Sequence, residues 1–357
     1  MTWAHRVGVF VMKPLPRLVI CMLIGWFLGN WLGLQHLETE QWYRPVTAAL
    51  LAVGLYASTY GIVLEKARKH FKLIVAAVTI GVLLKALLIG GSLWALSGLP
   101  IFWVLAINVS QIDPLSVANL EKTKMSKDAY SILGAWSSFD DPMTVLLGLY
   151  VPALLVAPAP GTPPIVQGGL GGYALGLGLN LVFAGVVFLV WRFTRLSAAN
   201  VTLVLLIGYL MLAFSFATAI MCLMMLGLAL IGLFLRPDHF ERVINSAVKV
   251  ALVLATILLG VLLVHGVNVL GGLGLGIAAY VAQIVVAVPL TRKLPRADRV
   301  HLMFAQQNGI TAIILSLLFE PTYPGTVAIV APAIVVTNLL HTVMNKWAVP
   351  RLLARVG

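Results

Sequence analysis

Long apolar stretches alternate with short polar loops along almost the whole chain. A helix needs roughly 20 mainly apolar residues to cross the hydrocarbon core of a bilayer. Stretches of about that length predict an all-α polytopic membrane protein with about 12 transmembrane helices. They cover residues 17–34, 44–64, 71–96, 99–120, 127–156, 173–192, 199–214, 217–235, 243–264, 268–291, 299–319 and 325–347.

No polar loop marks the boundary between the seventh and eighth predicted spans. Residues 199–235 form a nearly uninterrupted apolar run of 37 residues. Such a run is too long for one membrane helix and suits two short ones. We therefore place a boundary near residues 215–216.

The composition agrees with a membrane protein and leaves no room for a soluble domain. Hydrophobic residues make up 61% of the chain and charged residues only 10%, against about 25% charged residues in soluble domains. We treat residues 1–357 as a single transmembrane domain. Cys21 and Cys222 both lie in apolar stretches and form no disulfide or metal-binding pattern, so we expect no cofactor.

The charged loops predict an orientation in the membrane. If the N-terminus is cytoplasmic, 22 of the 24 Lys and Arg residues lie in cytoplasmic loops, whereas Glu38, Glu40 and Glu320 lie outside. Cytoplasmic loops are typically rich in Lys and Arg. The net charge of +12 therefore needs no nucleic-acid partner. We expect a multi-pass protein of the inner (plasma) membrane, in contact with the lipid bilayer, with both termini cytoplasmic.

Ionisable residues remain near the middle of three consecutive spans. Lys85, Asp113 and Asp141 each lie about 14 residues into their spans, roughly 20 Å deep and close to the bilayer midplane. Asp140 precedes Asp141. Because a charge at that depth costs on the order of 2.5–3.5 kcal/mol, such residues usually serve function. The alternative is a static, salt-bridged core around Lys85.

Helix-breaking residues accompany the aspartates. Asp113 is followed by Pro114 and Asp141 by Pro142, while residues 306–311 form a polar, glycine-containing stretch inside another span. Proline removes a helical hydrogen bond, and a broken helix exposes carbonyls and dipole ends that coordinate ions. We predict breaks at all three places; a simple kink at each proline is the alternative.

Neighbouring residues supply weaker candidates. Asp140 and Asp141 point about 100° apart on a helix, so one can face a cavity and the other a neighbouring helix. A carboxylate that takes up either a proton or a cation is what a proton-coupled exchanger requires. Ser137 and Gln283 are candidates either for the site or for helix–helix packing.

Two segments resemble the monovalent cation/proton antiporter superfamily, of the sodium/proton antiporter type. Residues 110–118 (SQIDPLSVA) resemble its Ser-Ala-Thr-Asp-Pro segment, and residues 136–141 (WSSFDD) resemble its Glu-Ser-Leu-Leu-Asn-Asp segment in the next helix. The Asp-Asp ending is similar to the electrogenic branch. Residues 51–65 and 307–315 are more weakly similar to further segments, in the same order along nearly the whole chain.

This resemblance implies a fold and a function. The fold would consist of two inverted repeats with crossing discontinuous helices. Mobile core helices would span about 71–156 and 268–347, and scaffold helices that form a homodimer about 17–64 and 173–264. The function would be secondary active exchange of Na⁺ or Li⁺, with K⁺ as a further candidate, for H⁺ by alternating access, without enzymatic activity.

The resemblance also assigns roles to residues. Asp141 would be the cation and proton carrier, Asp140 its partner, and Asp113 with the Ile112 carbonyl would lie at the first break. These three aspartates would be the ligands of the transported cation. The chain departs from the family pattern at four positions, where Ile112 replaces Thr, Trp136 replaces Glu, Asn308 replaces Arg and Gln283 replaces Lys or Arg.

We expect Lys85 to supply the missing basic partner, because its helix is the counterpart of the Gln283 helix in the inverted repeat. Other functions stay open: a non-exchanging cation channel, uniporter or sensor on the same scaffold, and, more remotely, an intramembrane aspartyl hydrolase. The hydrolase would use two buried aspartates as acid and base, but its Gly-x-Gly-Asp segment is missing from the sequence. Because no nucleotide-binding tail follows Gly357, we expect no nucleotide partner.

Overall fold

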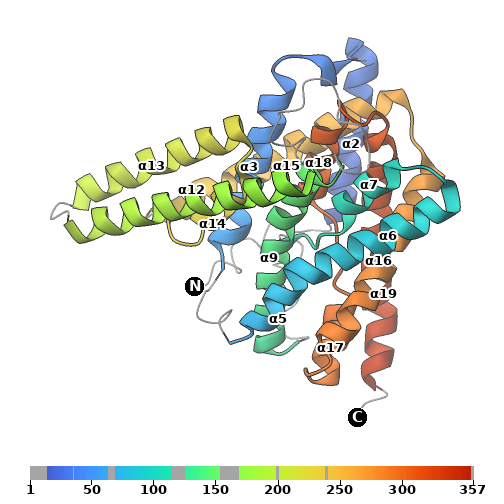
Figure 1. Ribbon diagram of the computed structural model, residues 1–357. Coiled ribbons are helices and arrows are strands. Elements are labelled where there is room, and N and C mark those ends of the chain that lie inside the picture. Colours follow the sequence, from blue (N-terminus) through green and yellow to red (C-terminus); the bar gives the residue numbers. More distant parts are fainter. Residues whose placement is uncertain are drawn as a thin grey trace.

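The computed structural model describes residues 14–34, 36–62, 69–114, 125–152, 169–197, 201–237 and 240–354, and all secondary structure among them is helical (Figure 1). The elements are α2 (Pro14–Leu32), η2 (Leu37–Thr39), α3 (Tyr43–Tyr60), α5 (Phe71–Ala76), η3 (Ala77–Gly81), α6 (Val82–Ser97), α7 (Ile101–Val109), α9 (Lys127–Tyr150), α12 (Gly169–Ser197), α13 (Val201–Cys222), α14 (Met225–Ile231), α15 (Phe240–Leu262), η4 (Leu263–His265), α16 (Val269–Leu290), α17 (Arg296–Met303), α18 (Ile310–Phe319) and α19 (Thr326–Ala354).

The prediction of an all-α membrane protein is confirmed. Seven stretches of helix among the described residues are long and apolar enough to cross a membrane, and α18 is a shorter apolar helix. The number twelve stays a prediction, because part of the expected fourth span lies in residues 115–124, outside the described residues. Helices α12 and α13 run side by side and project away from the other helices (Figure 1).

The boundary predicted at residues 215–216 is wrong. Helix α13 continues to Cys222, and the break falls at Leu223, which has a φ of 54°. The position of the break is set by tertiary contacts. The backbone N–H of Gly227 donates to Oδ1 of Asn180 in α12 at 2.7 Å, and a Cβ at Gly227 would lie 2.6 Å from Phe183. A uniformly apolar run gives no sign of such contacts.

The predicted break at Pro142 is also wrong, since α9 runs without interruption from Lys127 to Tyr150. Proline 142 has no N–H to donate to the carbonyl of Ser138, four residues earlier. The hydroxyl of Ser58 in α3 approaches that carbonyl oxygen at 3.4 Å. A neighbouring helix thus compensates for the missing donor, and the helix continues.

Two helix pairs pack at very short range. In the pair of α2 and α15, a Cβ at Gly25 would lie 2.1 Å from the carbonyl oxygen of Ile257, and Gly260 makes the reciprocal approach. In the pair of α16 and α19, a Cβ at Gly272 would lie 2.4 Å from Pro332. Small residues let membrane helices approach this closely, so each pair forms a tight unit.

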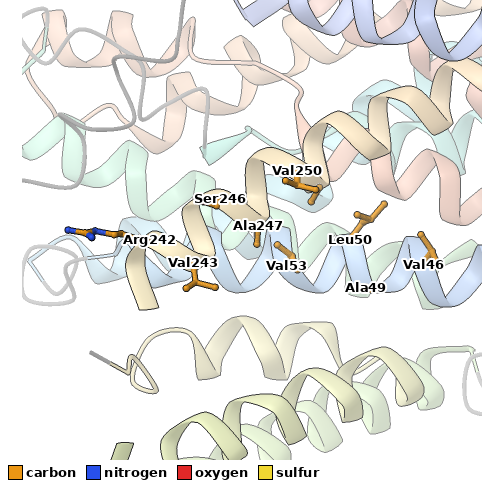
Figure 2. A pocket seen from close by; sticks show the side chains of 10 residues that line it. Val46, Ala49, Leu50, Val53, Arg242, Val243, Ser246, Ala247 and Val250 are labelled. Carbon is orange, nitrogen blue, oxygen red and sulfur yellow. The ribbon is translucent and has the colours of Figure 1, made fainter. Parts of the chain in front are cut away.

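An open groove of about 760 Å³ lies between α3 and α15 (Figure 2). Its lining is apolar except for Arg242 and Ser246 at one end. None of the buried aspartates reaches it, so it is not the ion site. The lining residues are Val46, Ala49, Leu50, Val53, Arg242, Val243, Ser246, Ala247, Val250 and Ala251.

Candidate functional site

Two non-helical segments meet in the interior of the protein. Helix α7 ends at Val109 and the chain is unwound through Asp113, while the segment 304–309 separates α17 from α18. The backbone N–H of Asp113 donates to the carbonyl of Gln307 at 2.9 Å. A Cβ at Gly309 would lie 2.3 Å from Cγ of Asp113, so this approach requires glycine. The two other predicted breaks, and their crossing, are therefore confirmed.

Side-chain amides bind the carbonyls that the breaks expose. The Nε2 atom of Gln306 donates to the carbonyls of Val109, at 3.0 Å, and Gln111, at 2.8 Å. The Nδ2 atom of Asn308 also donates to Val109, at 3.1 Å. From α19, Asn338 exchanges two hydrogen bonds with the backbone of Asn308. Because unpaired backbone groups are costly in a membrane, these amides hold the crossing together.

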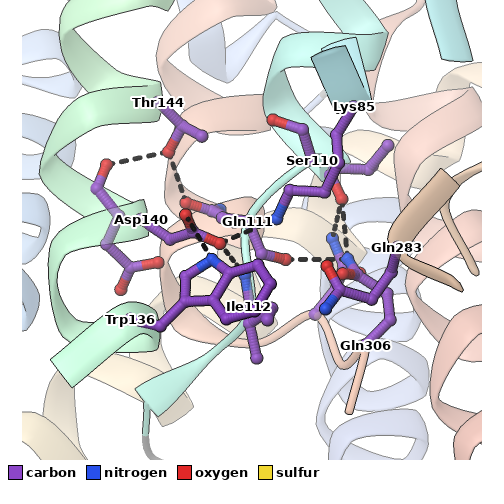
Figure 3. Close-up of polar contacts among 12 residues, drawn as sticks. Lys85, Ser110, Gln111, Ile112, Trp136, Asp140, Thr144, Gln283 and Gln306 are labelled. Atoms are coloured by element: carbon purple, nitrogen blue, oxygen red, sulfur yellow. Dashed lines mark hydrogen bonds and ion pairs between the residues drawn. The ribbon is translucent and has the colours of Figure 1, made fainter. Parts of the chain in front are cut away.

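A buried ion pair lies beside the crossing (Figure 3). The Nζ atom of Lys85 in α6 lies 2.8 Å from Oδ2 of Asp140 in α9, and both side chains are fully buried. The same Oδ2 accepts the backbone N–H of Ile112 at 3.2 Å. The indole Nε1 of Trp136 donates to Oδ1 at 3.2 Å. Asp140 is therefore compensated by a cation and two further donors.

The neighbouring Asp141 has a different environment. Its Oδ2 accepts the hydroxyl of Thr311, in the first turn of α18, at 2.7 Å. Its buried Oδ1 has no hydrogen-bond partner among the described residues. The carboxylate of Asp113 lies close enough to act electrostatically on Asp141. Two carboxylates and a hydroxyl thus converge at the N-terminus of α18, whose dipole favours negative charge.

This arrangement suits the binding of a small cation or a proton. Hard monovalent cations prefer oxygen ligands, and the crossing supplies the oxygens of Asp113, Asp141 and Thr311. The ammonium group of Lys85 is directed to Asp140 instead. The two adjacent aspartates are therefore not equivalent, since one is paired with a fixed charge and the other with a neutral hydroxyl.

Three expected site residues occupy supporting positions. The Nε2 atom of Gln283 donates to the carbonyl of Leu302 at 3.1 Å, which holds the end of α17. The hydroxyl of Ser137 donates to the carbonyl of Gly134 in its own helix at 3.1 Å. Asn308 bonds the backbone of the crossing, as described above. None of these hydrogen bonds reaches an aspartate carboxylate.

Sequence reasoning did not select Thr311, Gln306 or Asn338 as site residues. The first two belong to the polar stretch 306–311 that marked the break, so a signal was present for the segment. Only the fold shows which of its side chains turns to Asp141 and which to the backbone of the opposite segment. Asn338 is one of several polar residues in α19, which also contains Thr337, His341 and Asn345, so nothing in the sequence set it apart.

The sequence matches the family described as sodium/hydrogen exchanger, transmembrane, over residues 2–351. No curated protein sequence matches significantly.

Among solved structures, the sodium proton antiporter MjNhaP1 from Methanocaldococcus jannaschii at pH 8 is similar with a TM-score of 0.67 at 15% identity. The match covers 98% of this chain and 96% of that chain. An electron-microscopy structure of the same antiporter gives a TM-score of 0.62 at 15% identity, covering 94% of this chain and 91% of the other. At this identity the likeness concerns the fold alone.

Proposed function

Because the chain belongs to the sodium/hydrogen exchanger family, whose members are transporters and not enzymes, we propose that it exchanges a monovalent cation for H⁺ by secondary active antiport. Na⁺ and Li⁺ are the leading candidates, and K⁺ is a further one. The protein would act in the plasma membrane as a homodimer with both termini cytoplasmic. The observation that carries the proposal is the unequal environment of Asp140 and Asp141 beside the crossing.

In this mechanism Asp141 is the carrier. Its carboxylate binds either a proton or the cation, and both cannot occupy it together. Asp113 and Thr311 supply further oxygen ligands for the cation, together with the carbonyl of Ile112. Lys85 stays paired with Asp140, which keeps the fixed charges beside the carrier balanced.

Alternating access follows from the cost of buried charge. An empty, ionised Asp141 at mid-depth is expensive to move through the closed state of the protein. A carboxylate neutralised by a proton or a cation avoids that cost. The proposed core helices, at about 71–156 and 268–347, would therefore change access only when the site is loaded, and this requirement couples the two ions.

A scan of cations tests this function. The purified protein is reconstituted in liposomes with an interior acidified by a pH gradient and reported by a pH-sensitive dye. Na⁺, Li⁺ and K⁺ are then added outside in turn. Antiport predicts dequenching by at least one cation, because cation uptake drives proton release. Cation uptake without proton movement, from folded protein, would overturn the proposal in favour of a uniporter or channel.

A further inference from the structure

Three potential metal ligands lie close together in space, and none of them belongs to the ion site. His36 and Glu38 belong to the connection between α2 and α3, which lies at the top of Figure 1. His265 ends η4, between α15 and α16. One ligand atom from each of these three residues lies within 4.8 Å of the others. The Nδ1 atom of His36 is 3.7 Å from Oε1 of Glu38, and the two imidazole centroids are 5.8 Å apart.

Local structure fixes the backbone on both sides of this cluster. The carbonyl of His36 accepts the backbone N–H of Thr39 at 3.1 Å and its hydroxyl at 2.8 Å. Leu37 is buried between the two ligand residues. On the other side, Gly266 has a φ of 117° and ends the turn after His265. The close pairing of α2 with α15 holds the two segments together, so the convergence is built into the fold.

The electrostatics favour a cation at this place. The Oε2 atom of Glu38 is buried and has no hydrogen-bond partner among the described residues. The carboxylate of Glu320 lies close enough to interact electrostatically with both Glu38 and His265. Its two oxygens accept the backbone N–H groups of Gly325, at 2.8 Å, and Val327, at 2.6 Å. Glu320 therefore adds negative charge beside the cluster without being a ligand.

We propose that His36, Glu38 and His265 form a binding site for a divalent transition metal of the Zn²⁺ type. Two imidazoles and one carboxylate are a typical ligand set for Zn²⁺, with water at the fourth position. Alkali and alkaline-earth cations prefer all-oxygen sites, so the transported cation does not suit it. Both histidines are exposed, and their imidazoles can turn to contract the cluster around an ion.

A metal here would lie where the chain passes from the proposed scaffold to the second core segment. His36 and Glu38 follow α2, a proposed scaffold helix. His265 follows the scaffold helix α15 through η4, and three residues separate it from α16, the first helix of the second core segment. Bound metal would restrain the connection on which the core moves, so we expect it to slow exchange from this side of the membrane. This consequence rests on the proposed function; the binding site does not.

Metal binding is tested first, independently of transport. Tag-free, full-length protein in detergent is titrated with Zn²⁺ by calorimetry at pH 7.5, above the ordinary imidazole pKa of about 6.5. We expect one saturable site per chain. The double variant His36→Gln/His265→Gln should weaken binding by roughly 100-fold, since even an outer-shell partner is worth about 10–100-fold. The controls Glu40→Gln and His70→Gln, outside the cluster, should bind as the wild type does.

Saturable binding that persists unchanged in the double variant, or no saturable binding by the wild type, would overturn the site. In liposomes, external Zn²⁺ should slow cation-driven proton movement by the wild type but not by the double variant. Exchange that is unaffected by bound Zn²⁺ would overturn the link to transport. Absence of exchange altogether, with intact Zn²⁺ binding, would count against the proposed function and leave the metal site standing.

Discussion

The Nζ atom of Lys85 lies 2.8 Å from Oδ2 of Asp140, and both side chains are completely buried. The pair joins α6 to α9 beside the crossing of the unwound segments, and Ile112 and Trp136 donate to the same carboxylate. Since Asp140 is compensated in this way, we propose that the adjacent Asp141 is the carboxylate that exchanges its ligand.

Removal of the lysine charge should destabilise the protein through the aspartate left behind. We expect Lys85→Gln to lower the free energy of unfolding by about 3–5 kcal/mol, as for other broken buried pairs. The double variant Lys85→Gln/Asp140→Asn should recover much of this loss, because no lone charge remains. Unfolding in detergent checks both. Lys69→Gln, which breaks the exposed pair with Asp128, is the control and should cost at most about 1 kcal/mol. Equal losses in the single and double variants would contradict the account.

A methyl group at Gly309 should force the two unwound segments apart. The new Cβ would lie 2.3 Å from Asp113, and overpacking of this kind costs about 1–3 kcal/mol. We therefore expect Gly309→Ala to be less stable and to lose nearly all exchange. Gly134→Ala, on α9 with nothing within 4 Å of the new Cβ, should keep both stability and exchange. Normal exchange by Gly309→Ala would show that the segments do not approach as closely as described.

The side-chain amide of Gln306 should contribute to the stability of the protein. Gln306→Leu leaves the carbonyls of Val109 and Gln111 without this donor, and an unsatisfied buried group costs about 1–3 kcal/mol. We expect a corresponding loss in chemical unfolding experiments. Gln307→Leu, at the adjacent half-buried position, is the matched control and should change stability by much less. A similar cost for the two variants would mean that the amide of Gln306 does not support the crossing.

The hydroxyl of Thr311 should affect apparent cation affinity. Its hydrogen bond to Asp141 involves a charged group and is worth about 1.5–3 kcal/mol. Thr311→Val should therefore raise the half-saturating cation concentration by about 10- to 100-fold, given about 1.4 kcal/mol for each tenfold change. Thr311→Ser keeps the hydroxyl and should remain close to the wild type. Dose–response curves in liposomes separate the two, and an unchanged Val variant would remove Thr311 from the site.

Much of the site could be predicted because burial of charge in a membrane is costly. Lys85, Asp113, Asp140 and Asp141 were identified by depth alone, and the structure brings Lys85 to Asp140 and Asp113 near Asp141. The sequence could not show which aspartate pairs with the lysine. Adjacent residues on a helix differ by about 100°, so the answer depends on how α9 is rotated against its neighbours.

The two wrong boundaries have a common physical origin. Pro142 lies inside a continuous helix because Ser58, from a distant part of the chain, approaches the carbonyl that the proline leaves free. The break at Leu223 lies inside an apolar run because Gly227 packs against α12. In both cases a tertiary contact overrides the local signal, and no pattern within the segment carries that information.

The most direct test of the account compares Asp141→Asn with the wild type in the same liposomes. Asn can still accept the hydrogen bond from Thr311, but it carries no charge to neutralise with a proton or a cation. Asp128→Asn, which removes an exposed carboxylate from the same helix, is the matched control. We expect cation-driven dequenching in the wild type and in Asp128→Asn, and none in correctly folded Asp141→Asn. Full cation-dependent proton movement by Asp141→Asn would contradict the assignment of Asp141 as the carrier.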